Sequence, residues 1–444
     1  MSRARLIVPA IVLSLFVGCR GRDGDPHRAL LAYVDTLSAI DSHAHPMAYV
    51  VAGAPPDTDY DALPLDGLPP WEPPKALLPT NPALRRAQRA LYGRSAGDSG
   101  STESKAFLEV RSKVTQARGE RFSTWSLDQM HISVMLANRV AMGAGLTAPR
   151  FRWVAFADPL MLPLDISAEA IRTPDTKSLY PLEAKLLRRY LRDLGMSRVP
   201  ATLGRFEHDV VTATLERQKK TGAVAIKFEA AYLRALDFDA ADPAAAAAIY
   251  NRYSRGGVPA HAQYKTHEDH LIRVLCRDAG RLGLAVQLHS TSGFGGAYNA
   301  AGAAPHLLNS LFGDSTLKKT NFVIVHGGWP LVDETEIQLS RPNVYADISM
   351  LDILADSLGL QRAIRKWITK VPDKVLFGTD AFDGGPTDGW EQVGMMASQR
   401  ARQALGQAVL SMWLSHEITE ERAREIARLV LRDNAAKVYY LNQQ

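Results

Sequence analysis

Short apolar runs recur along the chain and alternate with segments whose apolar residues repeat at helical spacing. Runs of this length and near-continuous apolar character are typical of strands that are buried on both faces of a sheet. Eight such strands separated by helices predict an α/β fold, the (β/α)8 TIM barrel. The predicted strands cover residues 37–40, 132–137, 151–157, 223–228, 284–288, 321–325, 343–347 and 374–378.

Two long stretches interrupt this alternation. Residues 47–80 are rich in Pro, Gly and Asp, which predicts an irregular segment. Together with the helices that follow, it forms a predicted cap insertion after strand one, residues 47–120, and a second insertion covers about residues 160–200. A low-complexity run, Pro243–Ala248, indicates an excursion from the barrel. Extra C-terminal helices are predicted at residues 390–405, 407–414 and 419–431, outside the barrel.

The first residues have the pattern of an export signal. Arg3 and Arg5 precede an apolar run that ends at Val17 and is too short to span a bilayer. The junction of Gly18 and Cys19 resembles a bacterial lipoprotein signal, in which the cysteine is lipidated and becomes the new N-terminus. An ordinary signal peptide with an incidental cysteine is the alternative.

This pattern predicts the domain limits and the location of the protein. We expect residues 1–18 to be removed, residues 20–36 to form a tether and a leading helix, and residues 37–440 to form the barrel. Arg20, directly after the cysteine, resembles sorting to the outer membrane. The expected location is therefore the bacterial cell envelope, as a lipoprotein of the outer membrane that faces the periplasm.

Composition limits the expected partners. The chain has 444 residues, 46% hydrophobic and 22% charged, which is ordinary for a soluble globular protein. Removal of residues 1–18 takes away two arginines and lowers the formal net charge from +5 to +3, too little for a nucleic-acid surface. We expect a small-molecule substrate, no nucleic acid, and membrane contact through the lipid anchor only; oligomeric state is not predicted. Cys276 lies in a helical apolar pattern, which predicts a buried, inert thiol.

Residues that can carry chemistry stand where the predicted strands end. Two histidines follow strand one at a spacing of two, so both side chains point to the same face. Strand ends of a barrel converge on its C-terminal face, where active sites of this fold lie. Each residue alone has an ordinary structural role, but their convergence favours a metal site. The set is His43, His45, Lys227, Glu229, His289, His326 and Asp380.

Six motifs carry a family resemblance over the chain from about Leu37 to Tyr440. They resemble the amidohydrolase superfamily, in its amidohydrolase-related branch (amidohydrolase 2) of metal-dependent TIM-barrel hydrolases, and are most similar to the FluG-like group. The motifs span residues 41–46, 286–290, 325–330, 343–349, 376–381 and 434–439.

The resemblance implies a set of residue roles. His43, His45, His289 and Asp380 are the implied metal ligands, with Zn²⁺ as the expected ion and one or two divalent ions per chain. Zn²⁺ takes nitrogen and oxygen ligands and keeps a position for water. His326 is implied to orient or protonate the substrate or the attacking water, and Asp380 also serves as the base.

The role of the residues after strand four stays open. Some relatives carry a carboxylated lysine there that bridges two metal ions, and Lys227 occupies a compatible place. The alternatives are a cation that binds a substrate carboxylate or an ion pair with Glu229, which is itself a second candidate ligand.

Four further residues are candidates for substrate contact. Tyr232 and Arg234 follow strand four, and Trp329 follows strand six. Arg139 ends strand two and suits a carboxylate clamp, because guanidinium binds carboxylate through two parallel hydrogen bonds; a surface salt bridge is the alternative.

The expected function is a metal-dependent hydrolase that uses a metal-activated water to cleave an amide, ester or related bond. A decarboxylase of the same fold is the alternative. A third reading, of another class, is a catalytically inactive lipid-anchored binding protein.

Overall fold

The computed structural model describes residues 25–51, 53–64, 74–97, 100–291 and 299–441. The predicted signal segment and Cys19 therefore lie outside the described residues. Eight parallel strands form one sheet in the order β1 to β8, which confirms the predicted (β/α)8 barrel. The strands are β1 (Ala39–Ala44), β2 (Ile132–Asn138), β3 (Phe151–Phe156), β4 (Ala223–Phe228), β5 (Ala285–His289), β6 (Phe322–Val325), β7 (Val344–Asp347) and β8 (Val375–Leu376).

The first and last strands close the barrel. Backbone hydrogen bonds join Ser42 N–H to the Phe377 carbonyl (2.9 Å), Asp380 N–H to the His43 carbonyl (2.9 Å) and His45 N–H to the Ala381 carbonyl (2.7 Å). Strand β1 therefore extends to Ala44, beyond the predicted apolar run, because its polar residues still find backbone partners on both sides. This seam brings the two histidines of β1 beside Asp380.

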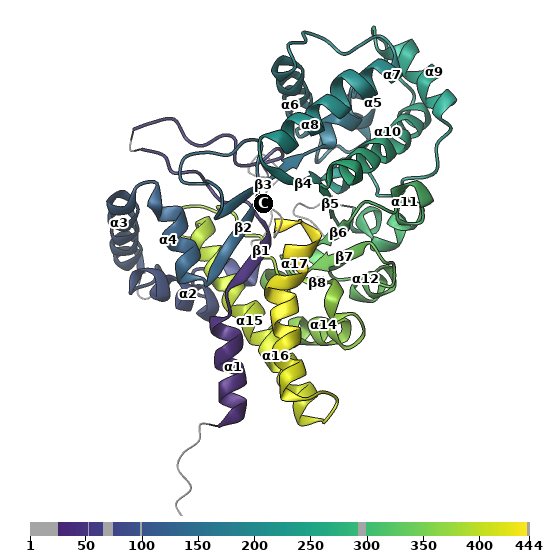
Figure 1. Cartoon of the computed structure of the whole chain (residues 1–444). Helices are drawn as coiled ribbons and strands as arrows, with labels where there is room; N and C mark the ends of the chain where they lie inside the picture. The colour runs from purple at the N-terminus through teal and green to yellow at the C-terminus, as the bar shows by residue number, and fades with distance from the viewer. Residues whose placement is uncertain (1–24, 52, 65–73, 98–99, 292–298, 442–444) are drawn as a thin grey trace, which may run out of the picture.

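Helices surround the sheet on its outer face (Figure 1). Helices α2 to α4 lie together on one side of the barrel, and α5 to α9 lie together on another. They are α1 (Pro26–Thr36), α2 (Pro82–Tyr92), α3 (Gly100–Arg118), α4 (Arg121–Gln129), α5 (Ser167–Arg172), α6 (Tyr180–Asp193), α7 (Leu203–Phe206), α8 (Ala213–Lys220), α9 (Pro243–Tyr253), α10 (His261–Leu282), α11 (Asn309–Phe312), α12 (Val332–Gln338), α13 (Leu351–Leu354), α14 (Ser357–Lys370), α15 (Trp390–Leu414), α16 (Glu420–Arg428) and α17 (Asn434–Val438). No helix among the described residues is both long and apolar enough to cross a membrane.

Two stretches are helical where the sequence predicted an excursion from the barrel and a break between two helices. The low-complexity alanine run forms α9, because alanine is the best helix former, Asp242 caps the first turn and Pro243 stands at the first helical position. Helix α15 runs without a break through Gly406. A Cβ on this glycine would lie 3.0 Å from Leu31 Cδ2, so the glycine allows α1 to pack closely rather than ending a helix.

The insertion after β1 has two parts with different positions. Its helices α2, α3 and α4 pack outside the barrel, where Arg111 of α3 and Tyr92 of α2 both bind Glu391 of α15, at 2.8 and 2.6 Å. The irregular residues 56–64 lie instead at the mouth of the barrel, where most of them line a cavity. Among the described residues of the insertion, Met47 and most of residues 56–64 line the cavity, whereas α2, α3 and α4 do not.

Candidate metal centre

A cavity of about 670 Å³ opens at the carboxyl ends of the strands. This volume is within the usual range for small-molecule sites, roughly 300–1,000 Å³. The structure brings most of the predicted site residues to its wall: His45, Lys227, Glu229, Tyr232, His289, His326 and Asp380. His43 is fully buried directly behind them.

Two compact groups of possible ligand atoms form this part of the wall. In the first, atoms of His43, His326 and Asp380 lie within 4.8 Å of one another. We call it the inner donor group. In the second, atoms of His45, Asp61 and Glu229 meet the same limit, and we call it the outer donor group. Asp61 comes from the irregular part of the insertion and was missed by sequence reasoning, because nothing in an irregular segment shows where its side chains point.

Asp380 connects the histidines of the two groups. Its Oδ1 lies 3.2 Å from His43 Nε2 and 3.7 Å from His45 Nε2, and its Oδ2 lies 3.9 Å from His326 Nδ1. Burial opposes ionisation, but the nearby His326 and His43 outweigh it and hold the pKa of Asp380 well below its usual value. The carboxylate is therefore ionised at neutral pH, as a metal ligand or a base requires.

The orientation of His43 is set by Gln287 of β5, which sequence reasoning also missed. Gln287 Nε2 donates to the Ser42 carbonyl at 2.7 Å and to the Tyr439 hydroxyl at 2.8 Å. Its Oε1 is left to accept from His43 Nδ1 at 3.2 Å. His43 therefore carries its proton on Nδ1, and the lone pair of Nε2 faces the site. The sequence did offer one sign of this role: Gln287 is a polar residue within the apolar β5 run, two positions before His289.

His326 is oriented in a similar way. Ser349 Oγ donates to Asp347 Oδ1 at 2.5 Å and so accepts from His326 Nδ1 at 3.0 Å. Asp347 Oδ1 also accepts from the His326 backbone N–H at 2.9 Å. Burial lowers the pKa of the imidazole well below its usual value, so His326 is neutral. A neutral, positioned imidazole can hold or pass a proton.

His289 and Lys227 both contact histidines of these groups. The His289 ring meets His326 edge to face, with ring centroids 4.7 Å apart, and lies tilted against Tyr232 at 4.6 Å. Lys227 Nζ lies 3.3 Å from His43 Nε2 and only 1% of the residue is exposed. The Lys227 amino group thus points at the lone pair of His43 Nε2, the same lone pair that is directed into the site. Burial and Lys227 both lower the pKa of His43, to about 4.

Three of the six described non-glycine residues with positive φ lie at these strand ends. His326, Met350 and Asp380 have positive φ values of 63°, 62° and 48°. Such conformations cost about 1–3 kcal/mol each for residues other than glycine and gather at functional sites. Met350 and the two donors all line the cavity.

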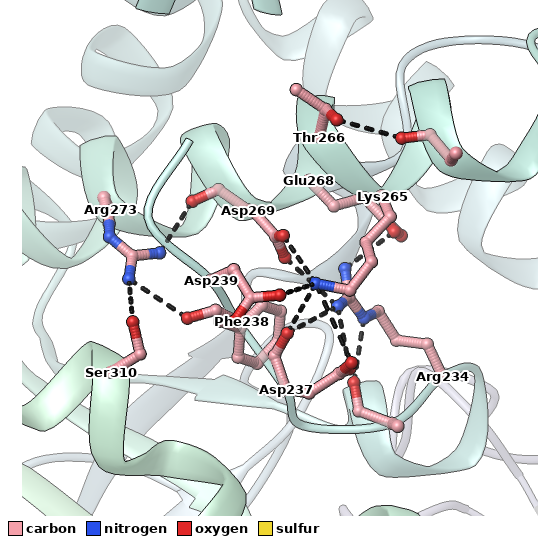
Figure 2. Close-up of polar contacts among 12 residues, drawn as sticks. Arg234, Asp237, Phe238, Asp239, Lys265, Thr266, Glu268, Asp269, Arg273 and Ser310 are labelled. Carbon is pink, nitrogen blue, oxygen red and sulfur yellow. Dashed lines mark hydrogen bonds and ion pairs between the residues drawn. The ribbon is translucent and has the colours of Figure 1, made fainter. Parts of the chain in front are cut away.

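The two arginines predicted to contact substrate have other partners. Arg139 is buried, binds Asp57 at 2.9 Å and donates to the Pro46 carbonyl at 2.6 Å, which fixes the irregular segment over the barrel. Arg234 binds Glu268, Asp269 and Asp237, at 2.8, 3.1 and 3.3 Å (Figure 2). Neither arginine lines the cavity, and Trp329 does not line it either. Tyr232 does.

Comparison with known proteins places this geometry in a family. A sequence profile of the amidohydrolase family matches residues 189–441, more than half of the chain. The chain belongs to the amidohydrolase family. The predicted family is thereby confirmed, and with it an enzyme whose family depends on metal ions and acts on small molecules. A search of curated protein sequences gives no match.

Solved structures show the same fold for this amidohydrolase. One is a putative metal-dependent hydrolase from Lactobacillus casei, with a TM-score of 0.57 and 15% identity, over 93% of this chain and 98% of that one. Glucuronate isomerase from Caulobacter crescentus matches with a TM-score of 0.55 and 15% identity, over 94% of each chain. Uronate isomerase from Thermotoga maritima matches with a TM-score of 0.54 and 14% identity, over 93% and 97%. At these identities the likeness concerns the fold.

Proposed function

We propose that this amidohydrolase is a metal-dependent hydrolase that cleaves an amide, ester or related C–N or C–O bond of a small molecule. The observation that carries the proposal is the inner donor group at the floor of the cavity. His43 offers a fixed lone pair, Asp380 is ionised, and His326 is neutral and held in place. These three properties together suit hydrolysis by an activated water.

The residues present fit a divalent metal ion. Buried imidazole and carboxylate atoms that converge from separate strands are the donor types that Zn²⁺ prefers. We propose His43, His45, His289 and Asp380 as the ligands, with Lys227 in carboxylated form or Glu229 as a further ligand. A bound Zn²⁺ polarises a carbonyl and lowers the pKa of a water from about 15.7 toward about 7.

The chain's own residues supply the proton transfers. Asp380 is ionised and lies beside His43, His45 and His326, so it accepts the proton of the attacking water. His326 Nδ1 lies 3.9 Å from the other carboxylate oxygen of Asp380, Oδ2, and donates to Ser349, so His326 Nε2 is placed to orient the substrate or the attacking water by accepting a hydrogen bond. Asp380 then delivers the proton that it has accepted to the leaving group. The walls around Asp380 and His326 restrict bulk water, because both groups are at least 93% buried, with exposed fractions of 7% and 2%.

Two other reactions use the same residues. A decarboxylase would keep the metal ligands and act on an acid, and an isomerase activity is named for two of the structural neighbours. Both reactions need a group that binds a carboxylate in those substrates. Arg139 and Arg234 are engaged in ion pairs, so Lys227 is the one basic side chain that the described cavity wall offers to such a carboxylate.

A substrate screen tests the proposal. Zn²⁺-loaded protein is assayed against N-acyl amino acids, dipeptides, lactones and aromatic carboxylates, with Asp380→Asn as the matched variant. We expect hydrolysis of at least one class, lost in the variant while its circular dichroism spectrum stays unchanged. Release of carbon dioxide from the aromatic acids would instead identify a decarboxylase. Normally folded protein that binds no divalent metal would refute every catalytic reading and leave the inactive binding protein.

We also propose that the protein is exported and anchored to the outer membrane through a lipid on Cys19. The support is the sequence pattern of residues 1–19. Cys19→Ser should move the protein from the membrane fraction to the soluble periplasmic fraction. An unchanged distribution would count against the anchor.

A further inference from the structure

The wall of the cavity is acidic. Its carboxylates come from three different segments of the described chain, and its lysines and arginines amount to a single residue, Lys227. The internal segments outside the described residues, 52, 65–73, 98–99 and 292–298, contain no Lys or Arg in their sequence. The carboxylates of the wall are Asp57, Asp61, Glu229, Asp380 and Asp383.

The basic side chains nearest the cavity are already engaged. Arg139 neutralises Asp57, and Arg234 is held by three carboxylates behind the wall (Figure 2). Lys227 lies at the floor, 3.3 Å from His43 Nε2 and 1% exposed. A substrate carboxylate in the outer part of the cavity would therefore lose its hydration shell without gaining an opposite charge.

The outer donor group is instead suited to bind a positively charged group. Glu229 is 5% exposed and its Oε2 is buried without a hydrogen-bond partner. Asp61 Oδ2 lies 3.1 Å from His45 Nδ1, although the ring is not aligned for a strong hydrogen bond. Two carboxyl groups with spare acceptor capacity thus face one point of the cavity, where buried acceptors require donors. Burial and the nearby Asp61 raise the pKa of Glu229 well above its usual value, and a cation at this point would favour the ionised form.

We propose that Asp61 and Glu229 bind a positively charged group of the substrate, an ammonium, and that the cavity discriminates against carboxylates. An ammonium has three donors and no acceptor, which matches two carboxylates. The proposal rests on the proposed function, because the ammonium would lie beside the inner donor group. A preference for an ammonium over a carboxylate would also distinguish the substrates of this chain from sugar acids.

An organic cation suits the outer donor group better than a second metal ion. His45 Nε2 faces Asp380 at 3.7 Å, so a histidine that binds metal there carries its proton on Nδ1. In that tautomer Nδ1 carries its proton 3.1 Å from Asp61 Oδ2 and is no ligand. Two carboxylates remain, fewer than the three protein ligands of a typical catalytic zinc site.

Three matched hydroxamates test the proposal on Zn²⁺-loaded protein by titration calorimetry. Their hydroxamate binds the metal ion, and their distal ends carry an ammonium (4-aminobutanehydroxamate), a methyl (pentanehydroxamate) or a carboxylate (glutaric monohydroxamate). We expect the ammonium compound to bind about tenfold tighter than the methyl compound, and the carboxylate compound about tenfold weaker, as charge-assisted hydrogen bonds of ordinary strength give.

Variants locate the effect. Asp61→Asn and Glu229→Gln should each reduce the preference for the ammonium compound severalfold. Asp59→Asn removes a carboxylate of the same segment that pairs with Arg189 outside the cavity wall, and should keep the preference. Equal binding of the three compounds, tighter binding of the carboxylate, or no binding of any by loaded protein would overturn the proposal.

Metal analysis distinguishes the remaining outcomes. Protein that takes up no metal at all contradicts the proposed function. Two metal equivalents in the unaltered protein that fall to one in Asp61→Asn would show a second metal ion as the occupant and overturn the ammonium site, while the proposed hydrolase stands.

Discussion

Gln287 links the barrel interior to the proposed metal centre, and its replacement should affect both stability and metal affinity. In Gln287→Leu the side chain keeps a similar volume but loses its hydrogen bonds to Ser42, Tyr439 and His43, of 2.7, 2.8 and 3.2 Å. All four residues are buried. Water therefore cannot replace the lost partners.

The expected magnitudes follow from these contacts. A buried polar group without a partner costs about 1–3 kcal/mol, and the substitution leaves three of them. We expect the free energy of unfolding to fall by at least about 3 kcal/mol. His43 would also lose the acceptor that fixes its ring, and loss of such a partner typically lowers metal affinity by about 10–100-fold.

Two measurements separate these effects. Urea unfolding of metal-free protein reports stability, and competition with a chelator reports Zn²⁺ affinity. Tyr439→Phe is the matched control, because it removes the hydroxyl that binds Gln287 and leaves the contact with His43 in place. It should lower stability by about 1–2 kcal/mol and keep the metal affinity. Unchanged Zn²⁺ affinity in Gln287→Leu would refute the orienting role.

Three further predictions test other parts of the structure. Arg139→Met should lower the free energy of unfolding by about 3–5 kcal/mol, because it leaves Asp57 as a buried unpaired charge; a loss below 1 kcal/mol in urea unfolding would contradict this. Cys276 is buried and burial raises the pKa of its thiol, so in Cys19→Ser protein a thiol reagent should react only after unfolding. If Lys227 is carboxylated, intact mass in bicarbonate should show the added carboxyl group and Lys227→Met should bind one metal ion fewer; equal stoichiometry would dismiss carboxylation.

The barrel and the floor of the site were predictable because both follow from local pattern. Apolar runs predicted every strand, and period-two spacing placed His43 and His45 on one face. In a closed barrel the first and last strands are neighbours, so the sequence also placed Asp380, after β8, beside the histidines of β1. The backbone hydrogen bonds between these two strand ends show this contact. Continuous helices were harder: Gly406 reads as a break in sequence, and only its contact with Leu31 explains it.

The outer cavity could not be predicted in the same way. Asp61 lies in a segment without periodicity, so its approach to His45 depends on tertiary contacts such as Arg139 with Asp57. Arg234 looked available for substrate because its partners Glu268 and Asp269 stand more than thirty positions later. Ion pairs between residues that are far apart in the sequence cannot be recognised from the sequence alone.

Equilibrium binding of Zn²⁺ to purified protein tests whether His43 and Asp380 hold a metal ion. We expect at least one tightly bound equivalent in the unaltered protein. His43→Ala and Asp380→Asn should each lose that equivalent with circular dichroism unchanged, and Asp59→Asn should keep it. Full retention of the tight equivalent in both of the first two variants would contradict the proposed metal centre.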